Sequence, residues 1–147
     1  MKLCDVTLRE GDQLPGRDYD TDAKITAGRE LDSLGIPFIQ AGFPVTGEKD
    51  QRVVSTLSEE TDAQVVALAR AIPSDVEVAL EANADVIEVF APLRDRQLER
   101  VIGKSREEMF DALRSSSFRW KTDAHFRIRN QSGCCTNDSR TGKYRPN

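Results

Sequence analysis

The stretch that decides the fold is Cys4-Asp5-Val6-Thr7-Leu8-Arg9-Glu10-Gly11-Asp12-Gln13, close to the N-terminus. A short β-prone run over residues 3–8 ends here in an arginine, two carboxylates and a glycine. Parallel α/β sheets bind ligands beyond the carboxyl ends of their strands, so charged residues that leave such an end are candidates for a site. We therefore predict a first strand over residues 3–8 that presents the polar residues 9–13 to a ligand.

Three further apolar runs of strand length, residues 36–41, 64–69 and 85–91, follow this first one. Each is too continuously apolar for a sheet with one face in water, so we predict buried parallel strands. Helix-like segments lie between the runs. The first has a cap at Asp20 and a stop at Gly35, the second spans residues 47–61, and the third begins at Pro73. Alternating strands and helices with short connections predict right-handed βαβ units.

Two more helices are predicted after the fourth strand. The first covers residues 94–102 and stops at Gly103. Ser105 and Glu108 then form a capping-box pattern, which is typical of the start of another helix.

The chain has 147 residues, whereas a complete (β/α)8 barrel needs about 250. Residues 1–113 hold 13 basic and 23 acidic residues, and residues 114–147 hold 8 and 2. The acidic body argues against nucleic-acid binding by this part of the chain. We see no apolar run long enough for a membrane span and no uninterrupted apolar core for a secretory peptide, so we expect a cytoplasmic protein without membrane contact.

The pattern of the chain changes at about Leu113. Residues 114–147 sustain neither a helical nor a strand period, so we expect an irregular basic tail. Two explanations stay open: a natural disordered tail, or a departure from the ancestral reading frame near Ser115, which we favour. The adjacent Cys134 and Cys135 lack the spacer that lets two thiolates bind one metal ion.

The first motif, D-x-T-L-R-[DE]-G-x-Q, resembles the opening signature of the 2-isopropylmalate, homocitrate and citramalate synthases of the DRE-TIM metallolyase superfamily. The resemblance implies a TIM barrel that condenses acetyl-CoA with a 2-keto acid. It also implies that Arg9 is the catalytic arginine at the keto-acid carbonyl, that Glu10 binds a divalent metal, and that Gln13 binds substrate. These roles suit the chemistry, because a guanidinium stabilises an oxyanion and Mg²⁺ or Mn²⁺ prefers oxygen ligands. The alternative is that Arg9 and Glu10 form an ion pair with a purely structural role.

A second motif, Ile39-Gln40-Ala41-Gly42-Phe43-Pro44, resembles the I-E-x-G-F-P sequence that follows the second strand of these synthases. The family's glutamate is Gln40 here, which we place with the substrate-binding residues. A neutral partner would hold Arg9 more weakly than a carboxylate, because charge-assisted hydrogen bonds are roughly twice as strong as neutral ones. We therefore expect reduced or altered activity.

A third region, residues 90–109, is similar to the fourth-strand segment of the isopropylmalate synthases. The family's Ser-Asp-x-His is Arg94-Asp95-Arg96-Gln97 here, so only the aspartate is kept, and it suits a helix cap equally well. The family also completes its metal shell with a His-x-His pair. The single histidine of this chain, His125, cannot form that pair. The resemblance implies Mg, Mn or Zn as cofactor and acetyl-CoA as co-substrate, and we expect this chain to bind the metal weakly because it lacks that pair.

We therefore predict an α/β fold: a partial TIM (β/α)8 barrel of about four βα units over residues 1–113, followed by an irregular tail. The predicted function is that of an impaired or inactive fragment of a 2-isopropylmalate synthase-like acyltransferase. Its partners would be a 2-keto acid and acetyl-CoA, with self-association into a homo-oligomer left open. The alternatives are a non-catalytic α/β module that pairs with a partner half-barrel, and a homocitrate or citramalate synthase or a lyase of the same superfamily.

Overall fold

The structure is a computed structural model that describes residues 3–16, 18–92, 98, 103, 105–118, 125–130 and 133–135. From residue 113 onward only the backbone path is described. The described strands form one sheet in the order β1-β2-β3-β4-β5-β6, in which neighbours in sequence are neighbours in space. All pairs from β1 to β5 are parallel, and β5 pairs with β6 antiparallel.

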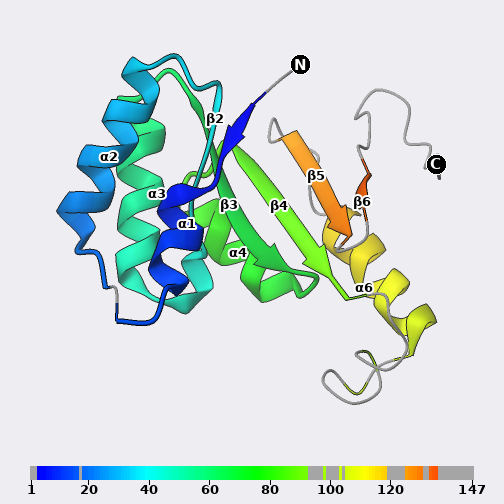
Figure 1. The fold of residues 1–147 in the computed structure, drawn as a ribbon. Coiled ribbons are helices and arrows are strands. Elements are labelled where there is room, and N and C mark those ends of the chain that lie inside the picture. Colours follow the sequence, from blue (N-terminus) through cyan, green and yellow to red (C-terminus); the bar gives the residue numbers. More distant parts are fainter. Residues whose placement is uncertain are drawn as a thin grey trace.

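The first four strands confirm the prediction of a parallel sheet built from consecutive units. They are β1 Cys4–Asp5, β2 Phe38–Gly42, β3 Gln64–Arg70 and β4 Val86–Ala91. The connecting helices are α2 Thr21–Ser33, α3 Glu48–Glu60 and α4 Pro73–Glu81. Figure 1 shows α2 and α3 side by side on one face of the sheet, with α4 next to β3. This is the order in which a barrel of (β/α) units is built.

The helix ends follow the capping residues of the sequence. Asp20 accepts a hydrogen bond from the backbone N–H of Ala23 at 2.7 Å and so caps α2. Gly35, at φ +75°, ends the same helix. Its N–H and that of Ile36 return to the carbonyls of Asp32 and Leu31, which is a Schellman motif.

The predicted capping box before α6 (Arg106–Phe118) is also confirmed. The backbone N–H of Ser105 donates to the Glu108 carboxylate at 2.7 Å, and the Glu108 N–H donates to the Ser105 hydroxyl at 3.2 Å. These reciprocal bonds satisfy two of the donors that a helix leaves open at its N-terminus.

The core lies between the sheet and its helices. Fully buried side chains of the strands, such as Ile39, Val65 and Ile87, pack against α3 residues including Val53 and Leu57. A second, smaller cluster of Phe38, Val66, Val86 and the partly buried Cys4 lies apart from this core. Because side chains alternate along a strand, this second cluster belongs to the opposite face of the sheet, the face that a closed barrel encloses.

Two parts of the fold differ from the sequence prediction. The first strand is shorter than expected, because Asp5 turns the chain immediately after it, as described below. We also expected no regular structure after residue 113, whereas α6 extends to Phe118 and strands β5 (His125–Asn130) and β6 (Gly133–Cys135) follow. The backbone of β5 continues the parallel register of β4, with Val86 opposite His125.

Candidate functional site

Arg9 and Glu10 lie on a short helical turn at the carboxyl end of β1. This turn, α1 Thr7–Glu10, begins because the Asp5 carboxylate accepts hydrogen bonds from the Thr7 N–H at 2.9 Å and the Thr7 hydroxyl at 3.3 Å. An aspartate that binds the backbone two residues ahead favours a turn over a continued strand. The turn buries Leu8 in the core and leaves Arg9 at the mouth of the sheet.

Arg9 is held from inside the sheet by residues of two other strands. Its Nε–H donates to the Gln40 Oε1 atom on β2 at 2.8 Å, and Gln40 Nε2 donates to the Glu88 Oε2 atom on β4 at 2.6 Å. Gln40 is fully buried and Glu88 is 4% exposed. A second nitrogen of Arg9 pairs with the half-exposed carboxylate of Glu10. Arg9 is thus fixed between a buried polar chain and an outer carboxylate.

Strand periodicity explains why Gln40 and Glu88 meet. Gln40 lies two residues beyond Phe38, and Glu88 lies two residues beyond Val86, so all four side chains share one face. Phe38 and Val86 form the apolar layer of that face. The two polar residues form the next layer toward the carboxyl ends of the strands, where Gln40 contacts Arg9.

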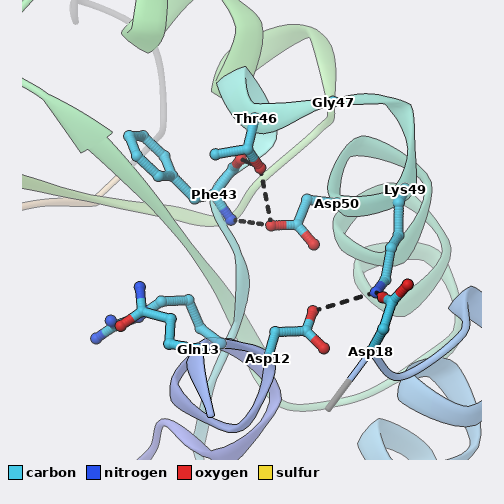
Figure 2. A pocket seen from close by; sticks show the side chains of 9 residues that line it. Asp12, Gln13, Asp18, Phe43, Thr46, Gly47, Lys49 and Asp50 are labelled. Atoms are coloured by element: carbon cyan, nitrogen blue, oxygen red, sulfur yellow. Dashed lines mark hydrogen bonds and ion pairs between the residues drawn. The ribbon is translucent and has the colours of Figure 1, made fainter. Parts of the chain in front are cut away.

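A buried lysine fixes the loop that follows Arg9. Lys24 on α2 is 2% exposed and pairs with Asp12 and with Asp50 on α3, each at 2.8 Å. Asp50 also accepts hydrogen bonds from the backbone N–H of Phe43 at 2.7 Å and from the Thr46 hydroxyl at 3.4 Å, as Figure 2 shows. Lys24 therefore joins the loop after β1 to the loop after β2.

The charges in this loop shift two pKa values. Burial alone would raise the pKa of Asp12. The hydrogen bond and charge of Lys24, the charge of Lys49 and the Tyr19 N–H outweigh it, so the pKa lies below its ordinary value. The pKa of Lys49 is raised, chiefly by its hydrogen bond to Asp18 at 2.8 Å, with Asp12 contributing at 3.4 Å. Both shifts favour the charged forms of Asp12 and Lys49.

These residues surround a pocket of about 290 Å³ at the carboxyl ends of β1 and β2. Arg9 and Gln13 line it, together with Phe43 and Thr46. The remaining lining residues are Asp12, Asp18, Gly47, Lys49 and Asp50, several of which Figure 2 shows in ion pairs. The pocket can therefore offer a guanidinium, an amide and an aromatic ring to a small polar ligand.

The structure brings together the four candidate residues from the sequence: three lie at or beside the pocket, and the fourth, Gln40, lies behind Arg9. Arg9 and Gln13 line the pocket, and Glu10 contacts Arg9. Gln40 lies behind Arg9 with its amide bonded at both ends. The region Arg94-Asp95-Arg96-Gln97 and most of the helix predicted over residues 94–102 lie outside the described residues.

The described residues do not complete a metal site. Among them, no group of three or more His, Cys, Asp or Glu is arranged to hold an ion. Glu10 offers one carboxylate, which is 51% exposed and already paired with Arg9. Catalytic metal sites take several protein ligands in a fixed geometry, so a metal at Glu10 would need further ligands from outside the described residues.

Sequence reasoning missed two buried charged residues of this site, Lys24 and Glu88, and one ion pair at the end of β3. Lys24 lies on the face of α2 that also buries Ile25 and Gly28, and Glu88 interrupts an apolar strand. In both cases a charged residue interrupts an apolar pattern, and this interruption is the signal in the sequence that could have identified it. At the end of β3, Arg70 makes a two-pronged ion pair with the buried Asp75 on α4, with N–O distances of 2.6 and 2.9 Å, which raises the pKa of Arg70.

The sheet, its helices and the site at the carboxyl ends of its strands define a part of an α/β barrel protein of the TIM type. A crystal structure of an HMG-CoA lyase from Bacillus subtilis superposes with a TM-score of 0.72 at 20% identity, covering 88% of this chain and 45% of the lyase. This likeness establishes the fold.

The HMGL-like family model matches residues 1–136, and the chain belongs to that family. A homocitrate synthase, AksA, from Methanosarcina mazei is 32% identical over 130 residues. A probable 2-isopropylmalate synthase from Methanopyrus kandleri is 36% identical over 112 residues. These alignments cover 88% and 76% of this chain. Both relatives are named synthases, so a non-catalytic module is not favoured.

The chain spans a third or less of the length of these relatives: 32% of the homocitrate synthase and 22% of the isopropylmalate synthase. None of the helices in the described part of the chain is long and apolar enough to cross a membrane.

Proposed function

We propose that this chain carries the 2-keto acid end of the active site of an acyl-CoA-dependent condensing synthase of the isopropylmalate and homocitrate type. The observation that carries the proposal is the anchoring of Arg9. Its Nε–H is bound at 2.8 Å to a fully buried residue, while the same side chain lines the pocket. A structural ion pair with Glu10 alone would not need a buried support.

In the proposed reaction, the Arg9 guanidinium stabilises the negative charge that forms on the ketone oxygen. The carbanion of an acetyl thioester attacks the C2 ketone of the keto acid. A C–C bond forms, the C=O π bond breaks and its electron pair moves to the oxygen. A guanidinium directed at this oxygen stabilises the developing negative charge more than it stabilises the neutral ketone, which lowers the barrier. Hydrolysis of the thioester then completes the family's reaction.

Other residues of the pocket suit the rest of the substrate. Gln13 can donate its amide N–H to the keto-acid carboxylate, and Phe43 offers an apolar wall to an alkyl side chain. We keep Glu10 as the proposed metal ligand, with the remaining ligands coming from outside the described residues. Acetyl-CoA is the proposed co-substrate, and a second protomer is a further proposed partner.

The experiment is a titration of the chain with 2-oxoisovalerate, pyruvate and 2-oxoglutarate, followed by NMR chemical shifts. Isovalerate, which lacks only the ketone of 2-oxoisovalerate, is the ligand control. We expect a keto acid to bind more tightly than its control and Arg9→Gln to weaken that binding by roughly tenfold, because a hydrogen bond to a charged group is lost.

Arg29→Gln is the matched protein control. Arg29 also pairs with a glutamate, Glu60, but it is about half exposed and does not line the pocket. It should leave the affinity unchanged. Equal binding of ketone and control ligands, or equal loss in the two arginine variants, would refute the assignment of Arg9. Addition of Mn²⁺ to wild type and Glu10→Gln, read by water-proton relaxation, tests the metal ligand separately.

Two expectations about the chain itself remain proposals. One is the domain boundary at residue 113, and the other is the departure from the ancestral frame near Ser115. Translation of the gene in three frames beyond that point tests both. A continuous barrel sequence with a His-x-His strand in another frame supports them, and its absence from every other frame refutes the frame change.

A further inference from the structure

Two neighbours, Arg9 and Glu88, act on the direction of the Gln40 amide. An ionised carboxylate only accepts hydrogen bonds and a guanidinium only donates them. Gln40 lies between the two, with Nε2 at 2.6 Å from Glu88 and Oε1 at 2.8 Å from the Arg9 Nε. The reversed amide would place its NH2 group against the Arg9 N–H and its oxygen against the carboxylate. Arg9 and Glu88 therefore require the same orientation of the Gln40 amide, and Glu88 stabilises it from the buried side.

We propose that Glu88 is the positioning residue for Arg9, acting through Gln40. It supplies, one residue further away, the negative charge that the family's glutamate supplies at position 40. The proposal deepens the proposed function above, because it concerns how the arginine assigned to the keto acid is held. It also revises the expectation that the neutral residue at position 40 holds Arg9 more weakly than a carboxylate.

Burial makes this relay effective. Gln40 is fully buried and Glu88 is 4% exposed, so the charge acts through a medium of low dielectric constant. A hydrogen bond donated to a carboxylate polarises the amide and strengthens the acceptor character of its oxygen. The inner Nε–H of Arg9 is thereby fixed, and the outer part of the guanidinium stays at the pocket.

Restoring the family's residue on its own would create a pair of buried carboxyl groups. Gln40→Glu would place a second carboxylate at hydrogen-bond distance from Glu88 in a buried layer. Two such groups cannot both be ionised without strong repulsion. Combining Gln40→Glu with Glu88→Gln exchanges the two groups. The new carboxylate then accepts from Arg9, and the new amide donates to it.

The experiment measures the Arg9 Nε–H directly in the ligand-free chain. Its NMR resonance is assigned from its loss in Arg9→Lys, and its exchange with solvent is compared among four variants: wild type, Glu88→Gln, Gln40→Glu and the exchanged pair. We expect Glu88→Gln to speed exchange by roughly tenfold or more, because the hydrogen bond from Arg9 to the Gln40 oxygen is weakened. Gln40→Glu should not speed it, because one carboxylate of the pair can take up a proton while the other still accepts from Arg9. The exchanged pair should return the rate to that of wild type.

Glu81→Gln, an exposed glutamate on α4, is the control for the loss of one negative charge. It should leave the Arg9 resonance unchanged. Unchanged exchange in Glu88→Gln, or losses that simply add in the double variant, would overturn the proposal. If Glu88→Gln fails to fold, rescue of folding and of the Arg9 resonance in the exchanged pair still supports it, and failure of that pair to restore the resonance overturns it.

The readout separates this proposal from the function on which it rests. Exchange of the Arg9 Nε–H is measured without keto acid, so an absence of ligand binding in wild type counts against the proposed function alone. An unchanged Arg9 resonance in Glu88→Gln, together with normal keto-acid binding, counts against the relay alone.

Discussion

Substitution of the buried Lys24 tests how the site is held together. Lys24 is 2% exposed and pairs with both Asp12 and Asp50, whose side chains are 22% and 14% exposed. Lys24→Met keeps the aliphatic length of the side chain but removes its charge, which leaves two partly buried carboxylates without their common cation. Loss of one partner from a buried ion pair costs about 3–5 kcal/mol.

The neighbours of the two carboxylates place the expected loss at the lower end of that range. Asp50 keeps the Phe43 N–H at 2.7 Å, and Asp12 keeps the Lys49 ammonium at 3.4 Å. We therefore expect Lys24→Met to lower the free energy of unfolding by about 3 kcal/mol. Urea unfolding followed by circular dichroism gives this quantity from the midpoint and slope of the transition.

Two further variants sharpen this prediction. Lys49→Met removes a lysine that is 33% exposed and pairs with the exposed Asp18, so it should cost less than about 1 kcal/mol. Adding Asp12→Asn and Asp50→Asn to Lys24→Met removes the unpaired charges and should recover part of the loss. Equal stability of the two lysine variants would refute the reasoning that burial gives Lys24 its importance.

Two other predictions concern the same loops. Gly42→Ala would place a methyl group 2.8 Å from the Asp50 carboxyl carbon, so we expect a loss of about 1–3 kcal/mol in urea unfolding. Gly11→Ala, with 3.4 Å to Tyr19, is its control and should be tolerated. The lowered pKa of Asp12 means that its carboxylate stabilises the fold above the unfolded pKa and that this contribution is lost as pH falls through the folded pKa. Wild type should therefore lose more stability than Asp12→Asn between roughly pH 5 and pH 3, and parallel pH profiles would contradict this.

The order of the fold was predictable from the sequence because its signals are local. Apolar runs of strand length, a cap at Asp20, a positive-φ glycine at Gly35 and a capping box at Ser105 each act within a few residues. The length of β1 was predicted incorrectly for an equally local reason. Asp5 binds the backbone of Thr7, and this turn competes with the strand that the apolar run favours.

The site was only partly predictable, because its supports come from distant parts of the chain. The motifs placed Arg9 next to residue 40, and the structure has them 2.8 Å apart. Glu88 and Lys24 were missed because each meets its partner only through the register of strands or the packing of helices. Gln40 and Glu88, for example, lie 48 residues apart in sequence. A charge within a buried pattern is the sequence signal for such residues, but it does not name the partner.

The support of Arg9 has a consequence for recombining barrels. The hydrogen bonds that orient its guanidinium from within come from β2 and β4, and its loop is fastened to α2 and α3. All of these elements lie within the first 91 residues. A hybrid made by fusing this segment to the complementary half of a relative should therefore inherit an already oriented arginine, so that the donor half need supply only the missing walls and ligands.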